Sequence, residues 1–143
     1  MIVFDLDGTL SIVGDRANEL KKDPPDWDRF YARCDEDLPN RPIMMLYRAF
    51  VWRNLDVRIV TGRRESERQK TIDWFASHGI WIRSSTDIFM RPDGDHRHDT
   101  ILKPELVAKF LGDIEVVFED RNSMVKKWRE LGITCCQVAE GDF

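Results

Sequence analysis

Two carboxylates near the start of the chain have the spacing that phosphoryl-transfer chemistry requires. An apolar run over residues 2–4 leads into Asp5, and Asp7 follows two positions later. One carboxylate could attack phosphorus while the other handles the proton of the leaving group. Gly8 permits a sharp turn, so that backbone N–H groups could face a phosphate. The alternative is a strand followed by an ordinary acidic turn, but the stretch as a whole favours an active site.

Polar residues also follow two other predicted strands. Thr61-Gly62-Arg63 follows a β-branched run, and Glu119 and Asp120 follow another. In open α/β sheets, ligands bind outside the carboxyl ends of the strands, so these groups are expected to converge with Asp5. Asp120, with Asp5 and a backbone carbonyl near Asp7, would suit Mg²⁺, which prefers oxygen ligands. The alternative for the acidic pair is a helix N-terminus that favours negative charge.

Lys103 is the cation expected to complete this site. It precedes Pro104, and proline favours the first turn of a helix, so Lys103 is predicted to lie near a helix start. Its ammonium group and the helix N-terminus would then both face a phosphate. The alternative is a solvated surface lysine. His96 and His98 form a possible zinc pair, but no third ligand is evident nearby in the sequence.

The elements that must position these residues alternate along the chain. Apolar or β-branched runs predict strands at residues 1–5, 57–61, 80–83, 87–89, 114–119 and 134–138. Helical spacing predicts helices around residues 74–75, 101–111 and 124–131, which end near Gly79, Gly112 and Gly132. This alternation predicts an α/β fold with a Rossmann-like, mostly parallel sheet and helices on both faces.

Residues 11–39 do not follow the alternation. They directly follow the acidic motif, and we expect them to form a small helical cap over the site within a single domain of residues 1–143. The predicted cap helix carries Trp27, Phe30, Tyr31 and Cys34. These aromatic residues are expected in the core of the cap; the alternative is a platform that stacks a nucleobase.

Composition narrows the possible partners. The chain has 143 residues, 34% of them charged, and a formal net charge of −4, which argues against broad electrostatic wrapping of nucleic acid. A pocket for one or two phosphates at a chain end is still compatible with that charge. No apolar run approaches the roughly 20 residues of a membrane span, and nothing resembles a signal peptide or a Gly-rich nucleoside-triphosphate loop. We therefore expect a cytoplasmic protein (in the host cytoplasm if viral) without a membrane or triphosphate site.

With these motifs, the chain resembles the haloacid dehalogenase (HAD) superfamily of aspartate-nucleophile phosphatases. The corresponding motifs are Asp5-Leu-Asp-Gly-Thr, Thr61, Lys103 and Glu119-Asp120. It is more closely similar to the C-terminal phosphatase domain of bacteriophage polynucleotide kinase/phosphatase. That likeness is carried by Arg91, Gly94, Asp95, Arg97, Asp99 and Lys103, and by the ending Trp128-Arg129…Gly132…Cys135-x-Gln137-Val-Ala-x-Gly-Asp-Phe143.

The resemblance implies a Mg²⁺-dependent phosphatase that removes a terminal 3′-phosphate from DNA or RNA through an aspartyl-phosphate intermediate. It implies that Asp5 is the nucleophile, Asp7 the general acid and base, Thr61 a ligand of the phosphoryl oxygens and Lys103 a neutralising cation. It further implies that Arg16, Arg63 and Asp99 bind substrate, and that Asp5, Asp7 and Asp120 hold the metal. The kinase half found in that family is not expected here.

One further departure from the family pattern and two alternative functions stay open. The family often has two aspartates where this chain has Glu119-Asp120, and the longer side chain could shift a metal-bound water. A small-molecule HAD phosphatase, acting on a nucleotide or sugar phosphate, is the alternative enzyme, although a small cap better suits a polymer end. A module that binds nucleic-acid ends without catalysis is the alternative from another class.

Overall fold

The computed structural model describes residues 1–141; Asp142 and Phe143, the end of the carboxyl-terminal motif, lie outside this range. The strands are β1 (Ile2–Phe4), β2 (Ser11–Ile12), β3 (Leu38–Pro39), β4 (Val57–Arg64), β5 (Ile88–Arg91), β6 (Val116–Arg121) and β7 (Thr134–Gly141). The α-helices are α1 (Trp27–Ala32), α2 (Arg41–Trp52), α3 (Arg68–Ser77), α4 (Asp99–Leu106) and α5 (Asn122–Glu130). The 3₁₀ helices are η1 (Asp15–Lys21), η2 (Glu65–Glu67), η3 (Ser85–Asp87) and η4 (Ala108–Asp113).

Five strands form one parallel sheet in the order β5-β4-β1-β6-β7. The central strand β1 is paired on both sides, with Phe4 opposite Ile59 of β4 and Phe118 of β6. Because all five strands run in the same direction, their carboxyl ends meet at one edge. The α/β fold with a mostly parallel sheet is confirmed, and its topology brings the ends of β1, β4 and β6 together.

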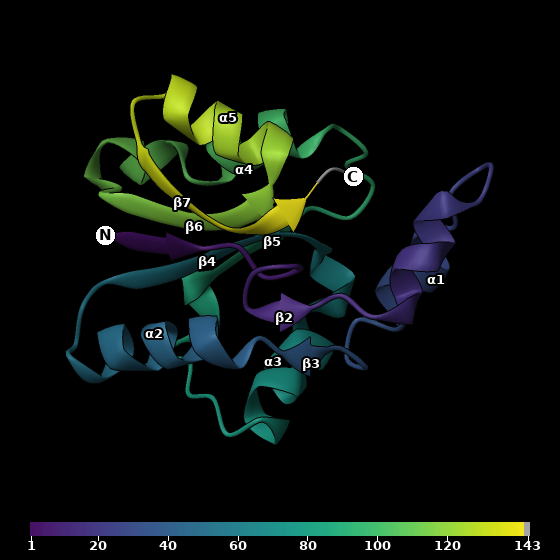
Figure 1. The fold of residues 1–143 in the computed structure, drawn as a ribbon, viewed down its shortest axis with the longest axis horizontal. Coiled ribbons are helices and arrows are strands. Elements are labelled where there is room, and N and C mark those ends of the chain that lie inside the picture. Colours follow the sequence, from purple (N-terminus) through teal and green to yellow (C-terminus); the bar gives the residue numbers. More distant parts are fainter. Residues whose placement is uncertain (142–143) are drawn as a thin grey trace.

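Alternating side chains of each strand fill two separate cores. Phe4 and Ile59 belong to a core with Trp74 of α3, whereas Val3 belongs to a core with Trp128 of α5. Successive strand residues point to opposite faces, which explains why neighbours in sequence enter different cores. Helices α2 and α3 cover one face and α4 and α5 the other, as predicted (Figure 1).

Two features of this framework differ from the sequence prediction. Residues 80–83 form no strand; Ile80 and Ile82 contribute to the core from a loop. A strand needs a partner, and β5 already occupies that edge of the sheet. Helix α2 was not predicted, because its segment is apolar along nearly its whole length, and Met44 and Tyr47 alone are fully buried.

The predicted helix over residues 101–111 begins earlier and is broken. Helix α4 starts at Asp99, because the His98 side chain accepts a hydrogen bond from the Thr100 N–H at 3.3 Å. Phe110, with φ of −131°, departs from helical geometry within the 3₁₀ segment that follows. Lys103 therefore lies in the last turn of α4, and the expectation that it lies near a helix start is wrong.

Strand β4 extends beyond its predicted end at Thr61, so that Gly62 and Arg63 lie within the strand. Its pairing with β5 shifts register between Val60 and Arg64. Such a shift turns side chains away from strict alternation. Arg63 consequently enters the site from the strand itself.

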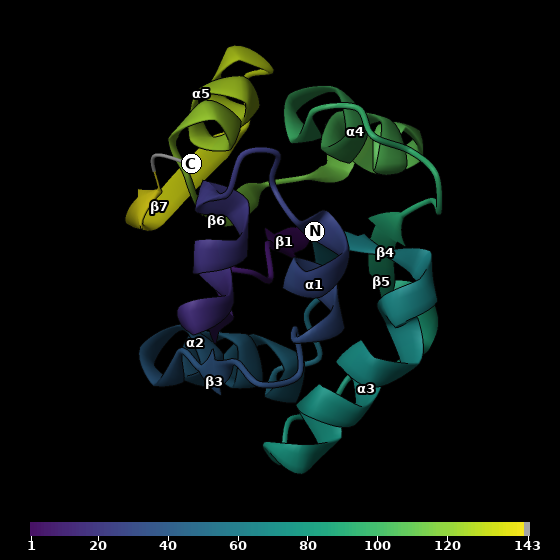
Figure 2. The ribbon, with the colours of Figure 1, turned by 90° about the vertical axis from the view of Figure 1, so that its right-hand side faces the viewer.

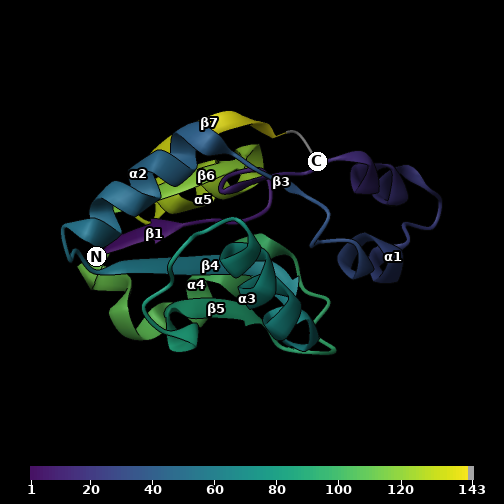
Figure 3. The same ribbon diagram turned by 90° about the horizontal axis from the view of Figure 1, so that it is seen from below.

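Residues 11–39 stand apart from the sheet. Strands β2 and β3 pair antiparallel at the two ends of this segment, and η1 and α1 lie between them. Figure 3 shows η1 and α1 beyond the end of β1, away from the chain start, and Figure 2 views the molecule from that side, with α1 in front of the sheet. Phe30 and Tyr31 are buried as expected, but Trp27 is 46% exposed, so its placement in the cap core is wrong.

Within residues 1–141, no helix has the length and apolar character needed to span a membrane.

Candidate active site

Three buried carboxylates and one lysine meet at the carboxyl ends of β1 and β6. Asp5 directly follows β1, while Glu119 and Asp120 belong to β6. One carboxylate oxygen from each of the three lies within 4.8 Å of the others. The Lys103 Nζ lies 2.6 Å from Asp5 Oδ1 and 2.8 Å from Glu119 Oε2. The predicted convergence of these strand ends with Lys103 is present in the structure.

The charges in this cluster do not balance, since one ammonium group faces three carboxylates. Burial, together with repulsion from Glu119, raises the pKa of Asp5 well above its ordinary value, although Lys103 opposes this. Burial and Glu119 likewise raise the pKa of Asp120 to about 7. Desolvation would lower the pKa of Lys103, but Asp5 and Glu119 raise it, so the lysine stays charged. A divalent cation beside these oxygens would relieve the excess negative charge.

Asp120 is held against the loop that follows β1. Gly8 has φ of +95°, and a Cβ at this position would lie 2.1 Å from Asp120 Oδ2. The Thr9 hydroxyl donates to Asp120 Oδ1 at 3.4 Å, and Gln137 Nε2 donates to the Asp120 carbonyl at 3.0 Å. Gly8 is thus needed both for its backbone conformation and for the space that Asp120 occupies.

Asp7 lies in a different electrostatic environment from Asp5. Arg63 donates to Asp7 Oδ1 through its terminal nitrogen at 2.7 Å, and Arg16 donates to the same oxygen at 2.5 Å. Burial alone would raise the pKa of Asp7, but the two guanidinium groups outweigh it and hold that pKa well below its usual range. Its carboxylate therefore faces the arginines, and the three clustered carboxylates are those of Asp5, Glu119 and Asp120. A role for the backbone carbonyl near Asp7 in metal binding stays a prediction.

Both arginines are buried, and each makes further hydrogen bonds. Arg16 also donates to Asp37 at 2.8 and 2.5 Å, and Arg63 donates to the Thr71 hydroxyl at 3.2 Å. Arg63 has an exposed fraction of 0%. In this arrangement the two arginines position Asp7; contact with substrate stays a prediction. Asp37 was missed, because nothing in the acidic run of residues 35–37 distinguishes it from its neighbours.

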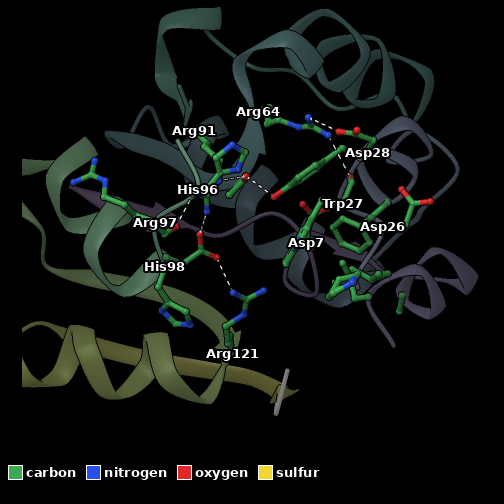
Figure 4. Close-up of a pocket in the computed structure, with 18 of the residues that line it drawn as sticks. Asp7, Asp26, Trp27, Asp28, Arg64, Arg91, His96, Arg97, His98 and Arg121 are labelled. Carbon is green, nitrogen blue, oxygen red and sulfur yellow. Dashed lines mark hydrogen bonds and ion pairs between the residues drawn. The ribbon is translucent and has the colours of Figure 1, made fainter. Parts of the chain in front are cut away.

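Thr61 is fully buried on β4, and its hydroxyl oxygen accepts a hydrogen bond from the Arg63 N–H at 3.1 Å. Asp99, at the start of α4, accepts a hydrogen bond from Arg121 at 2.8 Å and another from Arg91. Arg91 also donates to the Gly62 carbonyl at 3.0 Å. Asp99 thereby connects α4 with β5 and β6, and Arg91 extends the connection to β4; Figure 4 shows where Arg91 and Arg121 lie.

A cavity of about 1190 Å³ opens between residues 11–39 and the sheet. Asp5, Asp7 and Lys103 line it from the sheet side, and Trp27 and Tyr31 line it from α1. Figure 4 shows Asp7 and Trp27 in this lining. The Tyr31 hydroxyl donates to the Gly62 carbonyl at 2.9 Å. This bond joins α1 to β4 beside the cavity, and no sequence pattern indicated it.

A parallel sheet with a buried aspartate after its central strand, paired with lysine and acidic residues, defines a phosphomonoesterase of the HAD type. The family model described as polynucleotide kinase PNKP phosphatase domain matches residues 1–143. The chain belongs to this family.

Two solved structures are similar to the chain. One, titled "Structure of the Pnkp1/Rnl/Hen1 RNA repair complex", has a TM-score of 0.77 and 33% identity, and covers 99% of this chain. The other, titled "Structure of Pnkp1/Rnl/Hen1 complex", has a TM-score of 0.77 and 34% identity over 99% of this chain. The matches cover 43% and 46% of those two proteins, so this chain spans less than half their length. The closer likeness to a bacteriophage member stays a prediction.

Proposed function

We propose that this chain is a Mg²⁺-dependent polynucleotide 3′-phosphatase that acts on DNA or RNA through an aspartyl-phosphate intermediate. The observation that carries the proposal is Asp5, buried at the end of β1, bound by Lys103 and lining a cavity beneath α1. Membership of the PNKP phosphatase family supports a nucleic-acid substrate. We also propose that the protein is cytoplasmic.

Asp5 is the proposed nucleophile. One of its carboxylate oxygens forms a bond to phosphorus while the bond from phosphorus to the substrate 3′ oxygen breaks. Water then attacks the acyl phosphate, which releases inorganic phosphate and restores Asp5. Lys103, charged and in contact with Asp5, stabilises the ionised nucleophile and the negative charge on the transferring group.

Asp7 is the proposed acid and base. Its low pKa keeps Asp7 ionised, the form it needs in the second half-reaction, in which a carboxylate takes a proton from the attacking water. In the first half-reaction it must carry a proton to the 3′ oxygen. A bound phosphate dianion nearby would raise the pKa of Asp7, because a like charge disfavours the ionised form.

Asp5, Asp120 and the backbone near Asp7 would hold Mg²⁺, with Glu119 next to them. When bound, Mg²⁺ supplies positive charge that reduces the repulsion between an anionic nucleophile and an anionic phosphate. The cluster fits a cation because three buried carboxylates face only one ammonium group. Thr61 would bind phosphoryl oxygens, while Arg16, Arg63 and Asp99 would shape the substrate site.

We further propose that residues 1–143 form one domain in which residues 11–39 act as the cap. This cap leaves a cavity whose lining comes from both the cap and the sheet. An opening of this kind suits the end of a polymer. The RNA repair complex named for one structural neighbour makes RNA ends a substrate to include in any test.

A phosphate-release panel tests the proposal. It compares DNA and RNA 3′-phosphates, 5′-phosphates, free nucleotides and sugar phosphates, each with Mg²⁺ and with a chelator. We expect release from 3′-phosphorylated ends with Mg²⁺ only. Equal kcat/KM for a nucleoside 3′-monophosphate and an oligonucleotide 3′-phosphate would instead support the small-molecule phosphatase.

Asp5→Asn tests the mechanism in the same assay. The variant should lose phosphate release and keep its circular dichroism spectrum, because an amide cannot form the acyl phosphate. Asp73→Asn, an exposed position on α3, is the matched control and should keep wild-type turnover. Turnover in Asp5→Asn would exclude Asp5 as the nucleophile.

A further inference from the structure

We propose that the indole of Trp27 is the platform on which the terminal nucleobase of the substrate stacks. This inference rests on the proposed function and names the part of the substrate that the cap recognises. Trp27 is 46% exposed and lines the same cavity as Asp5 and Lys103. Its aromatic neighbours Phe30 and Tyr31 are buried, so Trp27 alone among these three cap aromatics presents a large exposed surface.

The indole is held in place before any ligand binds. Its ring centroid lies 6.0 Å from that of Tyr31, with the rings 27° apart, and 6.0 Å from that of Phe30 in an edge contact. The Trp27 carbonyl accepts a hydrogen bond from Arg64 of β4 at 3.3 Å. A ring that is already ordered loses little conformational freedom when a base stacks on it. Exposure combined with this support distinguishes Trp27 from an aromatic residue that simply fills the cap.

The surroundings of Trp27 offer an apolar surface on which a nucleobase can stack. Asp26 and Asp28 flank it and also line the cavity (Figure 4), but the Asp28 carboxylate is paired with Arg64 at 2.8 Å, and Lys21 and Lys22 line the cavity too, so charge alone does not select the ligand. Apolar side chains of the cap also line the cavity: Val13, Ala17, Leu20, Pro24 and Pro25. Together with the exposed indole they provide apolar surface, and every nucleobase offers an apolar π face that can stack on it.

The chain offers a matched control in Trp81. Its exposed fraction, 63%, exceeds that of Trp27, and it is not among the described residues that line the cavity. Substitution of Trp81 therefore removes an exposed indole of the same kind without changing the cavity wall. A loss of activity that occurs when Trp27 is replaced, but not when Trp81 is replaced, can therefore be attributed to the cavity.

The test uses two 3′-phosphorylated oligonucleotides that are identical except that one lacks the base of its last nucleotide. Trp27→Ala should lower kcat/KM for the complete oligonucleotide by roughly 5- to 150-fold, the usual effect of losing one base–aromatic stack, mainly through KM. The same variant should leave kcat/KM for the abasic oligonucleotide unchanged. Trp27→Phe should restore most of the loss, and Trp81→Ala should behave as wild type with both.

An equal loss of kcat/KM with both oligonucleotides would show that Trp27 only supports the cap. No loss with either would show that no base stacks on Trp27. Each of these results would contradict the proposal that Trp27 is a stacking platform. The wild type separates this failure from failure of the proposed function, because a wild type that acts on sugar phosphates but on neither oligonucleotide removes the function itself. A second measurement avoids turnover. In Asp5→Asn, the complete oligonucleotide should quench tryptophan fluorescence, and the quenching should disappear with Trp27→Phe but persist with Trp81→Phe.

Discussion

At the scale of single residues, Asp5 and Asp7 have different chemistry because different charges surround them. Asp5 shares its environment with two other carboxylates and one lysine, whereas Asp7 lies between two arginines. The pKa of Asp5 is raised and that of Asp7 is lowered. Two carboxyl groups whose pKa values are moved apart can take different roles in one reaction, here nucleophile and base.

The ion pairs of Asp7 with Arg16 and Arg63 should contribute to the free energy of unfolding. Asp7→Asn should lower the free energy of unfolding by about 3–5 kcal/mol at neutral pH, because it removes one partner of a buried ion-pair network. The difference from wild type should shrink as the pH falls. The folded-state pKa of Asp7 is depressed, so its contribution is complete above the unfolded-state pKa of about 3.9 and is lost as the pH falls toward the folded-state pKa.

Urea unfolding from neutral pH to about pH 3 measures this dependence. Asp73→Asn, which changes an exposed carboxylate, provides the control and should show little difference from wild type at any pH. A constant penalty for Asp7→Asn across this range would contradict the assignment of the low pKa to Asp7.

At the scale of elements, the site depends on how β1, β4, β6 and α4 end or begin. The turn after β1 passes so close to β6 that only glycine fits at position 8. The start of α4 at Asp99 places Lys103 one turn further along, where its side chain reaches Asp5. Motif residues far apart in sequence therefore meet through the packing of short, constrained segments.

Gly8→Ala tests this packing. The added Cβ would lie 2.1 Å from Asp120 Oδ2, and a φ of +95° is strained for alanine, so Asp120 must move. A displacement of about 1 Å in a catalytic site costs about 10²-fold in rate, and we expect kcat/KM for phosphate release to fall by about that factor. Gly112→Ala is the control, since its Cβ meets no atom within 4 Å and it lies in the 3₁₀ helix η4 without a positive φ. Equal activity of the two variants would mean that Asp120 does not need its observed position.

At the scale of the whole molecule, the excess negative charge of the acidic cluster should connect metal binding to stability. A cation that binds only the folded state stabilises it, by about 2.7 kcal/mol when its concentration is a hundred times the dissociation constant. The three buried carboxylates come from the residue after β1 and from β6, so this stabilisation would join two neighbouring strands of the sheet.

Adding Mg²⁺ should therefore raise the melting temperature of the wild type, and a chelator should reverse the rise. Asp120→Asn should lose most of this response, because it removes one of the proposed ligands, whereas Asp73→Asn should keep it. Thermal unfolding followed by fluorescence measures both. A full response in Asp120→Asn would place the Mg²⁺ site elsewhere.

The framework of the fold was largely predictable from sequence, because strand and helix periodicities depend on local patterns of apolar residues. The six runs that predict strands locate all five sheet strands, with one extra at residues 80–83. Three features were not predicted correctly: the absence of a strand at residues 80–83, the presence of α2 and the start of α4. Each depends on which neighbours are available for pairing, burial or capping. Such information does not exist within a short window of sequence.

The sequence by itself determined the residue types that chemistry needs and the strand ends that carry them: Asp5 and Asp7 after β1, and Glu119 and Asp120 in β6. Only the tertiary structure decided that Asp7 faces Arg16 and Arg63, that Asp37 completes their network, and that Trp27 lines the cavity. The physical reason is that charge pairing and exposure depend on distances between residues far apart along the chain. Those distances are set by the packing of the cap and helices against the sheet.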